Sequence, residues 1–274
     1  MPEACAGEVF AVEGVSFSYD GHPALKDVSF TVEAGESLSI LGANGTGKTT
    51  LLKVLDGLAA PDTGSVRFFG SPLTDRSLTG DLLRAFRSRV GLVFSDPDVQ
   101  LFSPTVFDEV AFGPLQLGLG PGEAARRADE LLDMLGISRL RDRPPYALSD
   151  GEKKKVAIAS VLAADPDVLL LDEPTGGLDP RSQVWFMELL AELRTLDKTF
   201  VISTHDLSLA EDFSDRIIVL SEGHGVAADG PKAEILADRA LLLEENIIHE
   251  HAHRHGDVVH VHSHGPFSVH DEHD

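Results

Sequence analysis

The residues with the clearest chemistry form one glycine-rich stretch, Gly42-Ala43-Asn44-Gly45-Thr46-Gly47-Lys48-Thr49. It matches the pattern GxxxxGK[ST] and stands between an apolar run, residues 37–41, and a helical pattern, residues 50–58. Glycines let the backbone curl so that several N–H groups point at phosphate oxygens, and the following helix adds its positive end. Lys48 would reach the outer phosphates of a nucleotide, and the Thr49 hydroxyl would bind Mg²⁺. A glycine-rich turn that binds nothing would not need every fixed position of the pattern.

Two acids follow a second apolar run, residues 168–171. Asp172 and Glu173 would therefore stand at the carboxyl edge of a sheet, where α/β folds bind ligands. There Asp172 would hold Mg²⁺ in its outer sphere, and Glu173 would polarise the water that attacks a terminal phosphate. His205, after a third apolar run, would contact that phosphate and orient Glu173. Taken alone, the acids could be solvated residues at a strand end, and the histidine could be a solvated turn residue. These residues indicate a catalytic site only because the phosphate loop is present in the same chain.

The elements that must position these residues follow from hydrophobic patterning. Residues 9–19, 28–32 and 65–69 alternate like strands, and a mostly helical region spans about 81–148. Helices then alternate with all-apolar strands, at residues 152–164, 168–171, 183–195, 199–203, 207–213, 217–220 and 232–236. This alternation predicts an α/β fold with a mainly parallel sheet that is covered on both faces.

Composition limits the class of protein. The 274 residues are 42% hydrophobic, enough for a core, but the longest apolar stretches are too short to span a bilayer. The single cysteine, Cys5, excludes an internal disulfide, and the N-terminus lacks a signal-peptide pattern, so we expect a cytoplasmic location. A formal net charge of −22 argues against a nucleic-acid partner while leaving room for a local nucleotide site.

Further motifs make the chain similar to a known family. Residues 148–153, Leu-Ser-Asp-Gly-Glu-Lys, resemble the signature motif of ATP-binding cassette (ABC) transporter subunits, and residues 176–180 resemble their D-loop. Tyr19 stands where family members have the aromatic residue that stacks on adenine. The resemblance covers about residues 9–243, with the motifs in the family's order and approximate spacing.

The resemblance implies the ATP-binding cassette fold, with an antiparallel β subdomain and an inserted helical subdomain at about 81–160. We expect a cassette domain over residues 1–245 and a histidine-rich tail over 246–274. Two cassettes, either two copies of this chain or this chain and a relative, would close head to tail on ATP and Mg²⁺, and hydrolysis would open them. We favour the homodimer.

The resemblance also assigns roles to residues. Ser149 and the helix N-terminus at Gly151 would meet the terminal phosphate held by Lys48 of the partner subunit. Glu173 and His205 would be catalytic, and Thr49, Asp172 and Ser95 would serve Mg²⁺. The implied ATP-binding set is Tyr19, Gly42, Ala43, Asn44, Gly45, Thr46, Gly47, Lys48, Thr49, Thr50, Ser149, Gly151 and Asp179.

Two positions depart from the family pattern. Ser95 stands where members usually have a glutamine that touches Mg²⁺, and a serine hydroxyl would reach the ion only through a water. Gln100 lies nearby without an evident substituting role. Asp150 stands where the signature usually has glycine, and its charge would oppose an incoming phosphate although it suits a helix start. We expect slower hydrolysis or weaker closure; the alternative is that both side chains face solvent and matter little.

Residues 96–102 and 105–114 resemble the ATPases of energy-coupling factor importers. Such importers take up vitamins or cobalt and nickel ions, using a transmembrane coupling protein and a substrate-binding membrane protein. The resemblance therefore implies a peripheral protein on the cytoplasmic face of the membrane. Phe102, Val106, Phe107 and Phe112 would line a groove for a helix of the coupling protein, or belong to an ordinary helical core.

Histidines accumulate after residue 246, at His249, His251, His253, His255, His260, His262, His264, His270 and His273. Alternation places imidazoles on one side of an extended chain, and imidazole suits Ni²⁺ and Co²⁺. We expect this tail to be disordered without metal and the first seven histidines to bind Ni²⁺ or Co²⁺. A solvated tail with incidental metal affinity is the alternative.

Three functions remain open from the sequence. The favoured one is the ATPase subunit of a cobalt or nickel importer. The second is the ATPase of a vitamin importer or another ABC transporter. The third is a soluble ABC protein that acts on DNA or ribosomes, for which the duplicated cassettes and basic arms typical of that class are not visible.

Overall fold

A six-stranded sheet forms the centre of the protein in the computed structural model, which describes residues 7–74, 78–255 and 258–264. Its strand order is β10-β9-β3-β8-β7-β6. Neighbouring strands are parallel except for the pair β9 and β10. The strands are β3 (Ser37–Leu41), β6 (Val90–Val93), β7 (Val168–Asp172), β8 (Thr199–Thr204), β9 (Arg216–Leu220) and β10 (Val226–Pro231).

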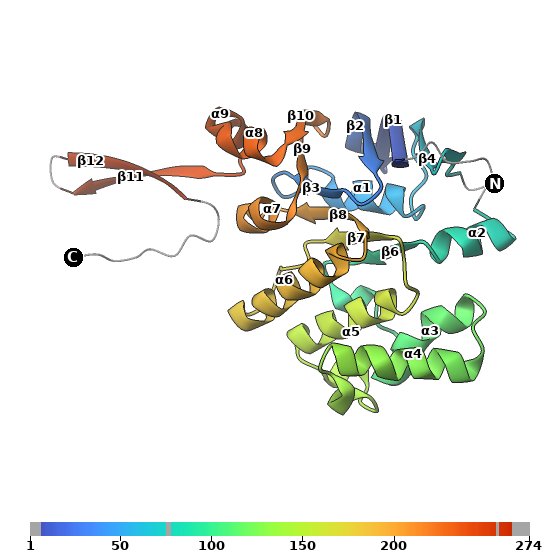
Figure 1. Cartoon of the computed structure of the whole chain (residues 1–274). Helices are drawn as coiled ribbons and strands as arrows, with labels where there is room; N and C mark the ends of the chain where they lie inside the picture. Colours follow the sequence, from blue (N-terminus) through green and yellow to red (C-terminus); the bar gives the residue numbers. More distant parts are fainter. Residues whose placement is uncertain (1–6, 75–77, 256–257, 265–274) are drawn as a thin grey trace.

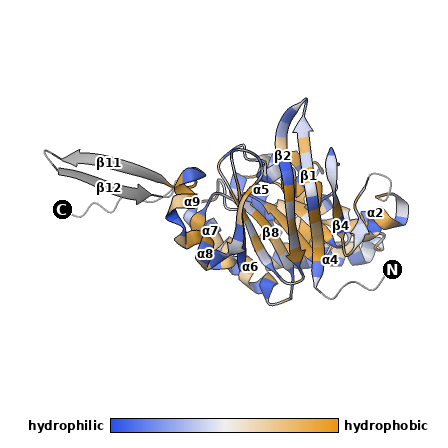
Figure 2. Ribbon diagram, turned by 90° about the horizontal axis from the view of Figure 1, so that it is seen from above, coloured by the Kyte–Doolittle hydropathy of each residue, from blue (hydrophilic) through white to orange (hydrophobic). Residues whose placement is uncertain are grey.

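Both faces of this sheet are buried, as the all-apolar strands predict. Along β7, Leu170 packs into one hydrophobic core while Leu169 packs into the other. Val201 and Phe200 of β8 divide in the same way. Hydrophobic residues accordingly gather on the strands in the middle of the molecule (Figure 2).

A second sheet is antiparallel and covers the first core. Its order is β2-β1-β4-β5, with bounds β1 (Glu8–Tyr19), β2 (His22–Glu33), β4 (Thr63–Phe68) and β5 (Ser71–Pro72). Valine, phenylalanine and leucine side chains of β1, β2 and β4 pack with those of the helix α1 (Lys48–Leu55). The long strand β2 begins at residue 22 rather than 28, because it pairs with β1 along nearly its whole length.

Helices cover the opposite face of the central sheet (Figure 1). Between β5 and β7 the chain forms α2 (Gly80–Arg87), α3 (Val106–Gln116), α4 (Pro121–Met134) and α5 (Asp150–Leu162). Helices α3, α4 and α5 pack on one another. The later helices are α6 (Pro180–Arg194), α7 (Leu207–Phe213), α8 (Lys232–Ala237) and α9 (Arg239–Glu244). None of the helices in the described ranges is long and apolar enough to cross a bilayer.

The part of the histidine-rich segment that is described forms a hairpin, where the sequence analysis expects a disordered chain. Strands β11 (His249–His255) and β12 (Val258–His264) pair antiparallel. Alternation with period two and the valines of the second strand favour a strand over a coil. The division into a cassette domain and a tail stays a prediction, and His270 and His273 lie outside the described residues.

A buried ion pair links the end of α1 to α2. Asp56 is the C-cap of α1, is 2% exposed, and lies 2.5 Å from the Arg87 guanidinium through Oδ2. Its Oδ1 atom is buried without a hydrogen-bond partner. Burial raises the pKa of Asp56 to about 6, against the opposing effect of Arg87. The position at a helix C-terminus, which disfavours a negative charge, acts in the same direction as burial.

We predict that the carboxyl of Asp56 makes the free energy of unfolding fall as pH rises from about 4 to 6. The folded protein keeps this proton to a higher pH than the unfolded chain does, so raising the pH favours unfolding across that window. Urea unfolding at several pH values should show Asp56→Asn gaining about 1–3 kcal/mol relative to wild type between pH 4 and 7. The exposed-site exchange Asp81→Asn is the control, and a pH-independent difference for Asp56→Asn would contradict the prediction.

Candidate active site

The glycine-rich loop joins β3 to α1, and its last glycine is required by geometry. Gly47 is the N-cap of α1 with φ of 106°, in the left-handed region. A Cβ at Gly47 would lie 2.1 Å from the Ala24 carbonyl oxygen of β2, so no other residue fits there. Thr46 is buried, and its hydroxyl donates to the Ala43 carbonyl at 3.0 Å. The loop is therefore held closely against the second sheet.

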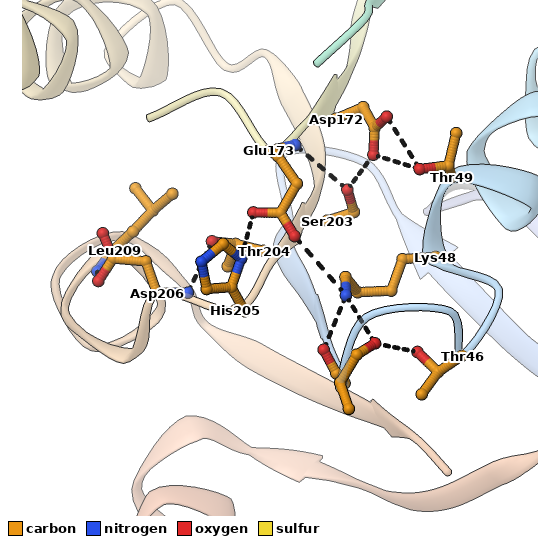
Figure 3. Close-up of polar contacts among 12 residues, drawn as sticks. Thr46, Lys48, Thr49, Asp172, Glu173, Ser203, Thr204, His205, Asp206 and Leu209 are labelled. Atoms are coloured by element: carbon orange, nitrogen blue, oxygen red, sulfur yellow. Dashed lines mark hydrogen bonds and ion pairs between the residues drawn. The ribbon is translucent and has the colours of Figure 1, made fainter. Parts of the chain in front are cut away.

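Lys48 points back over the loop toward the acids at the sheet edge (Figure 3). Its ammonium donates to the carbonyls of Gly42 at 2.7 Å and Ala43 at 3.0 Å, and lies 3.6 Å from Glu173 Oε1. Burial lowers the pKa of Lys48, while Glu173 and Asp172 act to raise it. A largely desolvated ammonium beside a loop of backbone N–H groups is suited to bind phosphate oxygens.

Asp172 meets Thr49 at the carboxyl ends of the parallel strands. The Thr49 hydroxyl lies 3.0 and 2.9 Å from the two carboxylate oxygens of Asp172, which is 1% exposed. The register of β7 and β8 sets Ser203 opposite Asp172, and the Ser203 hydroxyl donates to Oδ1 at 2.5 Å. A hydroxyl and a carboxylate are the hard oxygen ligands that Mg²⁺ prefers, so this pair fits that ion.

The Glu173 carboxylate lies between two nitrogen atoms. Oε1 faces Lys48, and Oε2 lies 2.8 Å from Nδ1 of His205. Glu173 has φ of 42°, and its N–H donates to the Ser203 carbonyl at 3.0 Å. A left-handed backbone at a glutamate is costly and persists only where surrounding contacts enforce it, which is typical of functional sites. The side chain is 19% exposed, so water can reach it.

Ser95 follows β6, and its role toward Mg²⁺ stays a prediction. It is exposed, and its described contact is made by its backbone carbonyl. Lys154 of α5 donates to that oxygen at 2.9 Å and to the Phe94 carbonyl at 3.1 Å. Gln100 donates to the Ala157 carbonyl at 3.0 Å and accepts from the Phe94 N–H at 3.2 Å. Gln100 therefore links the segment after β6 to α5.

Lys154 is a functional candidate that the sequence analysis missed. It is 2% exposed, and burial lowers its pKa to about 8 against the raising effects of Asp172, Glu173 and Asp96. Ser203 was likewise missed, although it ends the same apolar run that leads to His205. The signals were a lysine on the apolar face of a helix and a serine at a buried strand end. Neither is distinctive before the neighbouring elements are known.

The signature residues occupy the start of α5. Ser149 is its N-cap, and the first turn contains the exposed Asp150 and the half-buried Gly151 and Glu152. The described side-chain hydrogen bonds of Ser149 are with Glu152 of the same helix.

The remaining predicted residues lie around this centre. Asp179 is the N-cap of α6 and accepts from the Ser182 N–H at 2.9 Å and its hydroxyl at 3.1 Å; these bonds lower the pKa of Asp179. Thr50 is buried in α1. Tyr19 is 46% exposed at the end of β1, edge-on to the Phe17 ring. Asn44 lines a small surface pocket with His205 and Glu222.

An apolar groove of about 480 Å³ lies over α3 and α4. Phe102 and Phe112 face it edge to face, with ring centroids 4.9 Å apart, and Phe107 lies beside them. Phe102 is 66% exposed. Val106 is fully buried in the hydrophobic core, so for this residue the second alternative, an ordinary helical core, holds.

Metal binding by the tail stays a prediction. Among residues whose side chains are described, no group of three or more His, Cys, Asp or Glu side chains is arranged to hold a metal ion. The side chains of the seven tail histidines lie outside that set.

Comparison with known proteins places this geometry in a family. The family model described as ABC transporter matches residues 25–176. The nickel import ATP-binding protein NikO of Rhodobacter capsulatus is 47% identical over 87% of this chain and 95% of its own length. Several other relatives are described only as putative ABC transporter ATP-binding proteins.

Solved structures agree with this placement. CbiO1 from Clostridium perfringens, part of the ABC transporter complex cbiONQ, matches with a TM-score of 0.73 and 37% identity over 88% of this chain and 95% of that one. The ATP-binding cassette MJ0796, solved as a dimer in a post-hydrolysis state with ADP and Pi, also has a TM-score of 0.73, at 30% identity over 81% of this chain and 98% of that one. The chain therefore belongs to the ABC transporter family and is one of its ATP-binding, ATP-hydrolysing cassettes.

Proposed function

We propose that this cassette powers the import of cobalt or nickel ions as the ATPase subunit of an energy-coupling factor transporter. The observation that carries its chemistry is the contact of the Glu173 carboxylate with both Lys48 and His205. The similarity to a nickel import protein and the histidine-rich tail support the choice of ion. A vitamin importer or another ABC transporter is the alternative that these two observations disfavour.

Each residue of the site would have a separate role in ATP hydrolysis. The N–H groups of the glycine-rich loop and the Lys48 ammonium bind the β- and γ-phosphates of ATP. Thr49 and Asp172 would hold Mg²⁺, which when bound neutralises charge on the phosphate oxygens. The Glu173 carboxylate accepts a hydrogen bond from water and takes up one of its protons as the water attacks the γ-phosphate, while the bond to the β-phosphate breaks and ADP leaves. Lys48 and His205 keep that carboxylate in place.

Two copies of the chain would complete two such sites. Ser149 and Gly151 at the start of α5 would meet the nucleotide of a partner subunit. The start of α5 is the positive end of a helix, which favours a phosphate. The dimer of the similar cassette MJ0796 supports this arrangement. Tyr19, exposed at the end of β1, would stack on adenine.

The groove formed by Phe102, Phe107 and Phe112 would receive a helix of the transmembrane coupling protein. Aromatic residues are enriched at protein interfaces, where the partner buries them. Helix α5 connects the two sites, because Lys154 and Gln100 fix its side to the segment that leads from β6 to Phe102. Closure at Ser149 would thereby move the groove. The protein would lie at the cytoplasmic face of the membrane beside this partner and the substrate-binding membrane protein.

The tail would collect or buffer the transported ion. Pairing of β11 with β12 sets His249 opposite His264, His251 opposite His262 and His253 opposite His260. This register places the backbones of three histidine pairs directly opposite each other. Imidazole is a good ligand for Ni²⁺ and Co²⁺.

The identity of the transporter is tested by isolating the complex. Purification of this chain from its native membranes should bring with it a coupling membrane protein and a metal-binding membrane protein. Reconstituted vesicles should accumulate radioactive Ni²⁺ or Co²⁺ when ATP and Mg²⁺ are supplied. Accumulation of a vitamin in place of both ions would overturn the proposed substrate but not the ATPase.

We predict that Glu173→Gln lowers the ATP hydrolysis rate by at least about 100-fold, since an amide cannot take up the proton of water. ATP binding should persist, because Lys48 and the loop are unchanged, so ATP and Mg²⁺ should trap a dimer visible by light scattering. Lys48→Ala is the matched control and should lose ATP binding as well. Hydrolysis at the wild-type rate in Glu173→Gln would contradict the assigned role.

We also predict that Asp150→Gly raises the ATPase rate by about two- to tenfold, because it removes a negative charge from the helix end that faces the partner's phosphate. Ser95→Gln should act in the same direction by supplying a longer polar side chain at the sheet edge. Steady-state phosphate release measures both. Unchanged rates in both variants would mean that these side chains face solvent without consequence.

For the tail, we predict that Ni²⁺ or Co²⁺ binds to the full chain at pH 7.5 and that binding fades below about pH 6, where imidazole becomes protonated. A variant with alanine at His249, His251, His253, His260, His262 and His264 should lose most of this binding by calorimetric titration. ATP hydrolysis by this variant is the control for its folding. Undiminished metal binding would remove the tail from the proposal.

A further inference from the structure

The hydroxyl of Ser149 is already engaged with an acid of its own helix. Ser149 Oγ donates to Glu152 Oε2 at 3.2 Å, and the Ser149 N–H donates to the same oxygen at 3.1 Å. The Glu152 N–H returns a bond to Ser149 Oγ at 3.4 Å, which completes a capping box. The carboxylate thus occupies donors that the proposed function assigns to the partner subunit's ATP.

Glu152 also carries a negative charge at this position. The N–H of Ser149 and then the Arg139 guanidinium lower the pKa of Glu152, so the carboxylate is ionised at neutral pH. Asp150 adds a second acid in the same turn. An arriving γ-phosphate would meet two carboxylates around the serine that must bind it, and like charges at short range repel.

Arg139 is the cation that neutralises Glu152. Its Nη2 lies 2.7 Å from Glu152 Oε1, the oxygen that does not contact Ser149. The three lysines on the helix are occupied elsewhere: Lys153 lies 2.7 Å from Asp98, Lys154 donates to backbone carbonyls, and Lys155 lies over the Trp185 ring at 4.1 Å. Arg139 comes from the short 3-10 helix Ser138–Leu140 and is 66% exposed, so it can follow the carboxylate if that moves.

We propose that Arg139 is a positioning residue for ATP-driven closure. When the partner's γ-phosphate arrives, Arg139 draws the Glu152 carboxylate away from Ser149 and cancels its charge. The inference rests on the proposed head-to-tail dimer. Arg139 contacts the carboxylate, and through it controls whether the Ser149 hydroxyl is free to donate to phosphate. Loss of Arg139 leaves an uncompensated anion on the donors of the signature motif.

The test uses the full chain with Glu173→Gln as the parent, so that ATP is retained. Adding Arg139→Ala should raise the ATP concentration for half-maximal dimerisation by about three- to tenfold. ATP binding to the monomer should be unchanged, because Ser149 serves the nucleotide of the partner. Arg139→Lys should keep most of the parent's dimerisation. Arg126→Ala removes the same charge from an exposed ion-pair site on α4 and should have no effect.

A second substitution separates positioning from a general structural role. Glu152→Gln removes the charge that Arg139 is proposed to cancel, so it should dimerise at least as well as the parent. In that background, adding Arg139→Ala should change dimerisation by less than about twofold. The inference is overturned if Arg139→Ala alone dimerises like the parent, or if its defect persists with Glu152→Gln.

The failure of the wider proposal would look different. If the Glu173→Gln parent binds ATP but does not dimerise, the head-to-tail arrangement is wrong and the role of Arg139 falls with it. If the parent dimerises and only the Arg139 variants behave contrary to expectation, the role of Arg139 alone is refuted. Melting temperatures of all variants, measured without ATP, report whether any of them is unfolded.

Discussion

The Glu173 carboxylate between Lys48 and His205 is the interaction on which the rest of the structure depends. These three residues come from the ends of β7, β3 with its loop, and β8, and only a parallel arrangement brings those ends to one edge. The apolar strands of the central sheet form this edge at their carboxyl ends. They can be buried on both faces because the antiparallel sheet covers one side and the helices cover the other.

Electrostatics at this edge are balanced among a few groups. Lys48 and Lys154 are both largely buried, and burial lowers the pKa of each, while Asp172 and Glu173 favour their charged forms. The two ammonium groups hold carbonyl oxygens of the phosphate loop and of the segment after β6. Charge-assisted hydrogen bonds from these two ammonium groups therefore hold the phosphate loop and the segment after β6 at this edge. In a protein of net charge −22, such local cations are what allow a phosphate site to exist.

Much of the fold and of the centre could be predicted from the sequence. The phosphate loop, Asp172, Glu173 and His205 are recognisable because local spacing and strand ends decide their places. For Val106 the sequence left the choice between groove and core open, since hydrophobicity alone does not tell which apolar residue of α3 faces a groove and which faces the core. The hairpin of β11 and β12 was unexpected, because a polar histidine-rich segment matches the composition of disorder as well as the alternation of a strand.

The sequence by itself determined the chemistry available, because the glycines, Lys48 and the acids are set by residue type and local spacing. Tertiary structure alone decided which partners those side chains have. It brought Ser203 to Asp172, Lys154 to the backbone after β6, and Arg139 to Glu152. These residues are separated by 13 to 59 positions, and their contacts result from strand register and helix packing. Short-range patterns carry no information about such contacts, since the free energy that selects them comes from burial of the whole core.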